Sequence, residues 1–80
     1  FNPSTQISFD IPKSEFIILR IFNLLGQDVK TLTSKIMNPG RYTFEWDGKD
    51  LLSNDVASGV YFYELRGESF ISRKKMLLIR

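Results

Sequence analysis

The sequence predicts an all-β protein, an antiparallel β-sandwich of about seven strands. Apolar and polar residues alternate with a period of two along most of the chain, and turn-forming residues recur about every 8–12 residues. No segment shows helical periodicity over a useful length. Since 80 residues suffice for one domain, we expect residues 1–80 to form a single unit. A five-stranded barrel is the alternative, but the sequence offers too many strands for it.

The first half of the chain contains three predicted strands, over residues 6–11, 15–23 and 28–37. The second of these is apolar on both faces, so it should be central in its sheet or covered by a neighbouring domain. The third is more polar, and its inward residues are expected to be Val29 and Leu32. Because these two lie three positions apart, the strand should contain a bulge or a bend.

The second half contains three further strands, over residues 41–47, 59–66 and 69–80, and a short seventh strand is expected within residues 50–57. The segment Asn38-Pro39-Gly40 has the residues of a type II turn, in which proline fixes φ and glycine supplies a positive φ. The strands carry an aromatic ladder made of Tyr42, Phe44, Trp46, Tyr61 and Tyr63. The ladder could bind a sugar, but we favour core packing because small sandwiches bury area in this way.

A second set of apolar residues points away from the expected core. Its members are Phe16, Ile18, Phe22, Val60 and Phe62. If the strands that carry them are neighbours, these residues form an apolar patch that needs a partner. The alternative is that strand twist lets both faces flank the core.

The composition excludes many kinds of catalytic site. The chain contains no cysteine and no histidine, which removes disulfides, thiol nucleophiles, thiolate metal sites and any Ser-His dyad. We therefore expect a non-catalytic protein without a cofactor. The longest apolar runs are four residues, far short of the ~18 that a spanning helix needs.

Charge is distributed unevenly along the chain. Residues 1–72 hold seven basic and nine acidic residues, whereas residues 73–80 hold four basic residues and no acidic one. A basic end is a weak signal for nucleic acid or anionic lipid. We favour charges that keep an edge strand soluble, and expect no nucleic-acid partner, because no interleaved aromatic or glycine-rich binding loop accompanies them.

A polar loop offers the only candidate metal site. Its carboxylates are Asp47, Asp50 and Asp55, with glycine, serine and asparagine between them. Oxygen ligands along such a loop suit Ca²⁺, but calcium needs six or more oxygens and only three carboxylates are local. We favour a loop that uses these residues for turns and side-chain caps, with calcium as a weak alternative.

Several sequence blocks, in order and spacing, resemble a known family. The resemblance is to the C-terminal type A sorting domain of type IX secretion cargo, and to the related immunoglobulin-like domain of flagellar hook-scaffold proteins. It covers nearly the whole chain, and the combination is specific although each block alone is weak. The blocks are FNPSTQI (1–7), IFNLLGQDV (21–29), NPGRY (38–42), WDGKD (46–50), VASGVYFYEL (56–65) and KKMLLIR (74–80).

The resemblance implies an immunoglobulin-like β-sandwich at the C-terminus of a larger cargo protein from a Bacteroidetes–Chlorobi bacterium. The domain would be recognised by the outer-membrane export machinery and often removed by a sortase-like peptidase. The cargo would pass through the periplasm to the cell surface or the medium. The alternative is a structural or adhesive module that self-associates through edge strands, or an internal immunoglobulin-like domain of a surface protein. The family begins one short block earlier, so the N-terminal edge should be incomplete.

The resemblance also implies where the export machinery would bind. The family's signal lies in the last strands, which here carry Gly59, Val60, Lys74, Lys75, Met76, Leu77, Leu78 and Arg80. A receptor could add a strand to such an edge, with the basic residues as specificity contacts. The rival interpretation is that the apolar members belong to the core, and that their loss would destroy the fold.

Overall fold

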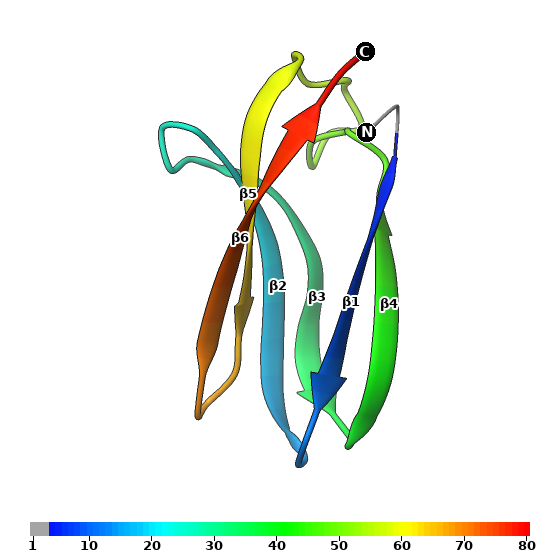
Figure 1. Ribbon diagram of the computed structural model, residues 1–80, viewed down its shortest axis with the longest axis vertical. Coiled ribbons are helices and arrows are strands. Elements are labelled where there is room, and N and C mark those ends of the chain that lie inside the picture. The colour runs from blue at the N-terminus through cyan, green and yellow to red at the C-terminus, as the bar shows by residue number, and fades with distance from the viewer. Residues whose placement is uncertain (1–3) are drawn as a thin grey trace.

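The computed structural model describes residues 4–80, which form six β-strands in two antiparallel sheets (Figure 1). Strand β1 pairs with β4, and the other sheet has the order β3-β2-β5-β6. The predicted all-β sandwich is confirmed. Within the described residues there is no helix long and apolar enough to cross a membrane. The strands are β1 (Thr5–Ile11), β2 (Glu15–Asn23), β3 (Asp28–Met37), β4 (Gly40–Trp46), β5 (Gly59–Arg66) and β6 (Ile71–Leu78).

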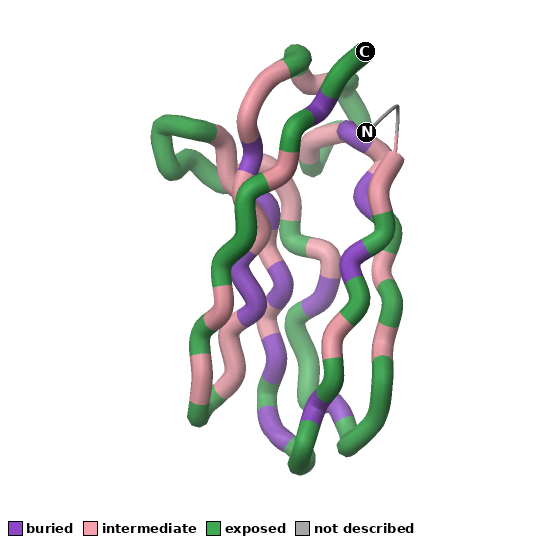
Figure 2. The backbone as a smooth tube through the Cα atoms, viewed as in Figure 1, coloured by how far each residue is buried: buried purple, intermediate pink, exposed green. Residues whose placement is uncertain are grey.

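The core lies between the two sheets. Along β2, burial recurs at every second position, and Ile17, Leu19 and Ile21 are wholly inaccessible (Figure 2). This strand is central, between β3 and β5, as its two apolar faces predicted. Burying one large aliphatic side chain contributes about 1.5–3 kcal/mol, so this one strand supplies much of the driving force for folding.

The aromatic ladder belongs to this core. Trp46 is fully buried, and its ring lies edge-on to Tyr61 with ring centroids 5.2 Å apart. Phe44 stacks on Phe9 at 5.9 Å, and Tyr42 stacks on the same ring at 5.9 Å. The sugar-platform alternative is therefore wrong for this ladder.

The predicted irregularity of β3 is confirmed. The pairing register between β2 and β3 shifts twice, and at each shift one β3 residue lies between two paired positions. These extra residues are Leu32 and Val29. Both pack against the core, because each bulge turns a side chain inward despite the spacing of three.

Two predicted details are wrong. Gly40 has φ 152°, far from the roughly +80° of a type II turn, and it opens β4. The expected strand within residues 50–57 is reduced to an isolated bridge between Lys49 and Asp55. The cause is Asp50, whose Oδ1 accepts hydrogen bonds from the backbone N–H groups of Leu52 and Asn54 and holds a turn. The prediction of an incomplete N-terminal edge concerns a block before Phe1, and so lies outside the described residues.

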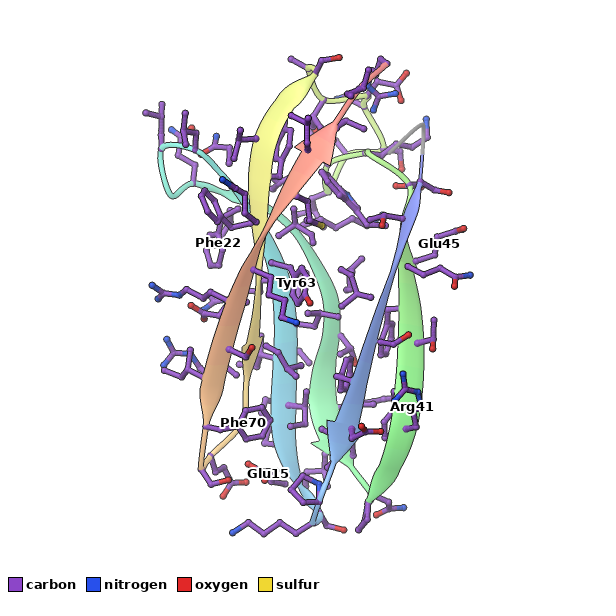
Figure 3. The ribbon with its side chains drawn as sticks, in the orientation of Figure 1. Glu15, Phe22, Arg41, Glu45, Tyr63 and Phe70 are labelled. Carbon is purple, nitrogen blue, oxygen red and sulfur yellow. The ribbon has the colours of Figure 1, made fainter. Side chains whose placement is uncertain are left out.

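A buried carboxylate fixes the turn between β5 and β6. Glu15 Oε1 accepts hydrogen bonds from the backbone N–H groups of Glu68 (2.7 Å) and Ser69 (3.1 Å). Burial raises the pKa of this carboxyl, but the donors outweigh it and the pKa lies below its ordinary value. A Cβ at Gly67 would collide with the Glu15 carboxylate and with the Phe70 ring, so the close approach requires glycine (Figure 3 labels Glu15 and Phe70).

Candidate functional site

The outer face of the four-stranded sheet holds the second apolar set. Because β2 and β5 are neighbours, Phe22 lies directly opposite Phe62, which in turn lies opposite Lys75 of β6. Figure 3 shows Phe22 on the side of the sheet away from β1 and β4, whereas Tyr63 lies between the sheets. The strands that carry the outward apolar residues are therefore neighbours, which is the condition under which the sequence predicted an apolar patch.

A buried charge cluster lies beside this patch. The Glu64 side chain is only 1% exposed, and its carboxylate accepts hydrogen bonds from Arg73 Nε (2.6 Å), Arg66 Nε (3.2 Å) and Arg20 Nη2 (3.4 Å). Burial raises the pKa of Glu64, but the guanidinium groups of Arg73 and Arg66 outweigh it and hold the pKa below its ordinary value. The alternation placed Glu64 on the outer face, but no sequence pattern indicated that it is buried.

An open groove runs between this patch and β6. Its volume is about 440 Å³. Two phenylalanine residues and three basic residues of β6 line it, and no acidic residue does. We call it the cationic groove, and it is lined by Phe22, Asn23, Leu24, Gly26, Phe62, Arg73, Lys74 and Lys75.

The residues implied as a recognition signal have different places in the structure. Leu78 is fully buried and Met76 packs against the core, so these two serve the fold, as the rival interpretation held. Lys74 and Lys75 are exposed on β6, an edge strand. Antiparallel pairing places the remaining strand positions side by side, with Gly59 opposite Leu78 and Val60 opposite Leu77.

Arg80 has a structural role that the sequence did not reveal. Its Nε donates to the carbonyl of Val56 (2.6 Å), its Nη2 donates to the carbonyl of Gly48, and its Nη1 lies 3.5 Å from Asp55 Oδ1. Its backbone N–H also donates to Ser58 Oγ. The side chain therefore clamps the loop between β4 and β5. These contacts give Arg80 a place in the fold, and its predicted role in recognition stays a prediction.

Replacing Arg80 with glutamine should loosen this loop and lower the free energy of unfolding by about 1 kcal/mol, because a charged donor to two carbonyl groups is lost. Hydrogen exchange should accelerate at the Val56 amide, which donates to the same Gly48 carbonyl. Lys75→Gln is the matched control and should change stability by less than about 0.5 kcal/mol, because Lys75 is exposed. Unchanged exchange at Val56 in the Arg80 variant would contradict the clamp.

The calcium alternative is not supported, because each carboxylate of the loop has another partner. Asp47 Oδ1 accepts from the Lys49 amide (3.1 Å), and Asp50 caps its own turn. Asp55 Oδ1 lies 3.0 Å from Lys49 Nζ, and this hydrogen bond, with the charges of Arg80 and Lys49, lowers the pKa of Asp55. Residues 4–80 contain no group of three acidic side chains that could hold a metal ion.

Comparison with known proteins adds four findings. A family profile described as the FlgD Ig-like domain matches residues 3–69. FlgD from P. aeruginosa has a TM-score of 0.71 at 22% identity, covering 94% of this chain and 59% of that one. FlgD from Xanthomonas campestris, linked to the hook capping essential for flagellar assembly, has a TM-score of 0.63 at 22% identity, covering 94% of this chain and 55% of that one. No curated protein matches.

These comparisons bear on the fold more than on the site. The chain spans between 55% and 59% of the two solved structures, and the structural likeness at 22% identity shows the fold. The family profile ends at residue 69, before β6 begins at Ile71. The basic strand and its side of the cationic groove therefore lie outside the matched residues.

Proposed function

Since the chain belongs to the FlgD Ig-like domain family, we propose that it is a non-catalytic structural module that self-associates through the edge strands of its sandwich. A role in assembly fits the hook capping with which the Xanthomonas campestris relative is linked. The proposal includes the case in which the chain is an internal immunoglobulin-like domain of a larger surface protein.

The observation that carries this proposal is the two-stranded sheet. Within the described residues β1 and β4 pair only with each other, so both are edge strands. An edge strand presents unpaired N–H and C=O groups to which another chain can add a strand. The two strands are seven residues long, enough for a continuous ladder between copies.

The charges on the edges favour this sheet over β6. Two β6 strands would bring Arg73, Lys74 and Lys75 of both copies together, and like charges placed opposite each other oppose pairing. The β1–β4 sheet carries both signs, since Arg41 Nη1 lies 3.3 Å from Asp10 Oδ2 (Figure 3 labels Arg41). Copies of this sheet can therefore pair with opposite charges facing.

Sedimentation velocity on the isolated chain from micromolar to millimolar concentration tests the proposal. The apparent mass should rise above 9.3 kDa with concentration. Arg41→Glu should weaken the association, because it leaves the β1–β4 sheet without its exposed cation. Lys13→Glu, in the turn after β1, is the matched charge-reversal control and should have no effect. A mass that stays at 9.3 kDa throughout would contradict self-association.

A second candidate function is a sorting signal for type IX secretion, and the exposed basic edge favours it. Neither the Lys74 nor the Lys75 side chain forms an ion pair within residues 4–80, so both are available to a receptor that adds a strand to β6. In this role the domain would follow a cargo domain and engage the outer-membrane export machinery. A sortase-like peptidase would then remove it at the cell surface or before release.

The double variant Lys74→Ala/Lys75→Ala tests the sorting role in a cargo fusion. Cargo should accumulate in the periplasm, while the domain keeps its circular dichroism spectrum and its melting temperature. Arg80 is left unchanged because its loss would loosen the 48–58 loop. Lys13→Ala/Lys35→Ala is the matched control, since both lysines are exposed and belong to neither β5 nor β6. Normal export of the folded β6 variant would rule out basic recognition.

A further inference from the structure

We propose that the cationic groove binds an acidic segment of a partner protein that carries an apolar anchor residue. The inference goes beyond self-association, because it concerns the opposite sheet and a different partner. It rests on the apolar surface of the groove, the charge of the basic residues at its edge (its rim) and the hydrogen bonds of the turn beside it.

The apolar surface is incompletely covered. Phe22 and Phe62 lie opposite each other across β2 and β5, and both are half-buried. The adjoining turn carries Leu24, which is 69% exposed, and Leu25, which is 82% exposed. An apolar patch of this kind, rimmed by polar residues, marks a contact site on a small protein. An apolar side chain entering between Phe22 and Leu24 would remove this surface from water.

The basic residues that form the rim of the groove favour an anionic partner. Arg73, Lys74 and Lys75 line the groove, and no acidic side chain does. Glu64 pairs with Arg73, but within residues 4–80 it forms no ion pair with Lys74 or Lys75, so the charges of these two lysines remain. Asp28, which lies opposite Phe22 on the β3 side, lines a separate hollow. An acidic segment is therefore attracted to this groove and a basic one is repelled.

The turn beside the groove is held by its own hydrogen bonds. Asn23 Oδ1 accepts hydrogen bonds from the amides of Leu25 (3.0 Å) and Gln27 (2.9 Å), and its Nδ2 donates to Gln27 Oε1 (2.8 Å). Its backbone groups also bond to Gln27 and Gly26. Leu24 is thus fixed at the groove wall, and a partner would not have to order this segment on binding.

The size of the groove and the charge of the rest of the chain favour a peptide over a polyanion. A volume of about 440 Å³ accommodates a few side chains. Residues 1–72 carry a net charge of −2, so the net positive charge that a membrane surface or a nucleic-acid backbone could contact is confined to the end of the chain. A short acidic segment touches only the basic rim.

Chemical-shift titration of the ¹⁵N-labelled 80-residue chain tests the inference. The probe is a short peptide with acidic residues on both sides of a central Leu-Phe pair. One control peptide replaces its acidic residues with lysine, and another replaces Leu-Phe with Ser-Ser. The acidic probe should give saturable shifts at the amides of Leu24, Phe62 and Lys75. The lysine peptide should give none, and the serine peptide should bind about tenfold more weakly.

Charge reversal of the rim provides the decisive control. Lys74→Glu/Lys75→Glu should weaken binding of the acidic probe at least about tenfold and allow the lysine peptide to bind. Lys13→Glu/Lys35→Glu carries the same charge change elsewhere and should leave binding intact. Three results would each overturn the inference: no saturable shift in the groove, equal binding of the lysine peptide, or tighter binding of phosphatidylglycerol vesicles or duplex DNA. Self-association is measured separately, so either proposal can fail alone.

Discussion

Replacing Trp46 with alanine should lower the free energy of unfolding by about 4 kcal/mol, the range found when a buried aromatic residue is truncated. Trp46 is the largest fully buried side chain among the described residues. Its ring packs edge-on against Tyr61, and its Nε1–H donates to the carbonyl of Lys49 at 3.0 Å. The substitution therefore removes core contacts and also detaches the start of the 48–58 loop.

Urea denaturation followed by far-UV circular dichroism measures this loss without relying on tryptophan fluorescence. Trp46→Phe should lower the free energy of unfolding by less than the alanine variant does, because an aromatic ring is kept. Its stability should still fall below that of the wild type, because the hydrogen bond to Lys49 is lost. Leu52→Ala is the surface control, since Leu52 is 79% exposed, and should stay within about 0.5 kcal/mol of the wild type. A loss below about 1 kcal/mol for Trp46→Ala would contradict its place at the centre of the core.

Replacing Glu64 with glutamine should lower the free energy of unfolding at neutral pH by about 2–3 kcal/mol. The carboxylate is inaccessible and accepts hydrogen bonds from Arg20, Arg66 and Arg73. Glutamine can accept from fewer donors and carries no charge. The loss falls short of the maximum for a broken buried pair because the three arginine side chains are partly exposed and regain water.

The same variant should lose part of the pH dependence of folding. The folded state holds the pKa of Glu64 below its ordinary value of 4.5, so the unfolded chain binds its proton first as the pH falls. The contribution of Glu64 is therefore full above about pH 5 and is lost as the pH falls below 4.5, through the folded pKa. Glu64→Gln removes this part of the acid destabilisation. Glu15 and Asp55, whose pKa values are also lowered, still contribute their own parts of the acid destabilisation in this variant.

Urea midpoints measured between about pH 7 and pH 2.5 check both parts of this expectation. The difference in urea midpoint between the wild type and Glu64→Gln should be largest near neutral pH and should shrink in acid. Glu45→Gln is the control, because Glu45 is an exposed carboxylate on β4. A difference that stays constant across this range would show that the pairing of Glu64 does not depend on its ionisation.

Much of the fold could be predicted because burial follows the alternation of side chains along each strand. The bounds of β2, β3 and β5 agree with the predicted segments. The spacing of Val29 and Leu32 indicated the bulges, since two inward residues three positions apart require an extra residue. The strand expected within residues 50–57 does not form, because the Asp50 side chain competes with the ladder for the backbone N–H groups of residues 52 and 54, as the favoured interpretation of this loop as turns and side-chain caps implies.

The candidate site was less predictable because its contacts join residues far apart in the sequence. Glu64 meets Arg20 across 44 positions, and Arg80 reaches Gly48 across 32. Nothing in the local sequence around Arg80 separates a clamp from a recognition residue. Phe22 and Phe62 were identified as outward-facing, but only the pairing of β2 with β5 places them together beside the lysines of β6.

Amide hydrogen exchange at low and high protein concentration locates the surface through which copies of this domain meet. Self-association through the two-stranded sheet predicts slower exchange on concentration along β1 and β4, with no change along β6. The slowing should disappear in Arg41→Glu and persist in Lys13→Glu. Exchange that does not change with concentration along β1 and β4, or that slows along β6 instead, would contradict an assembly built from β1–β4 edges.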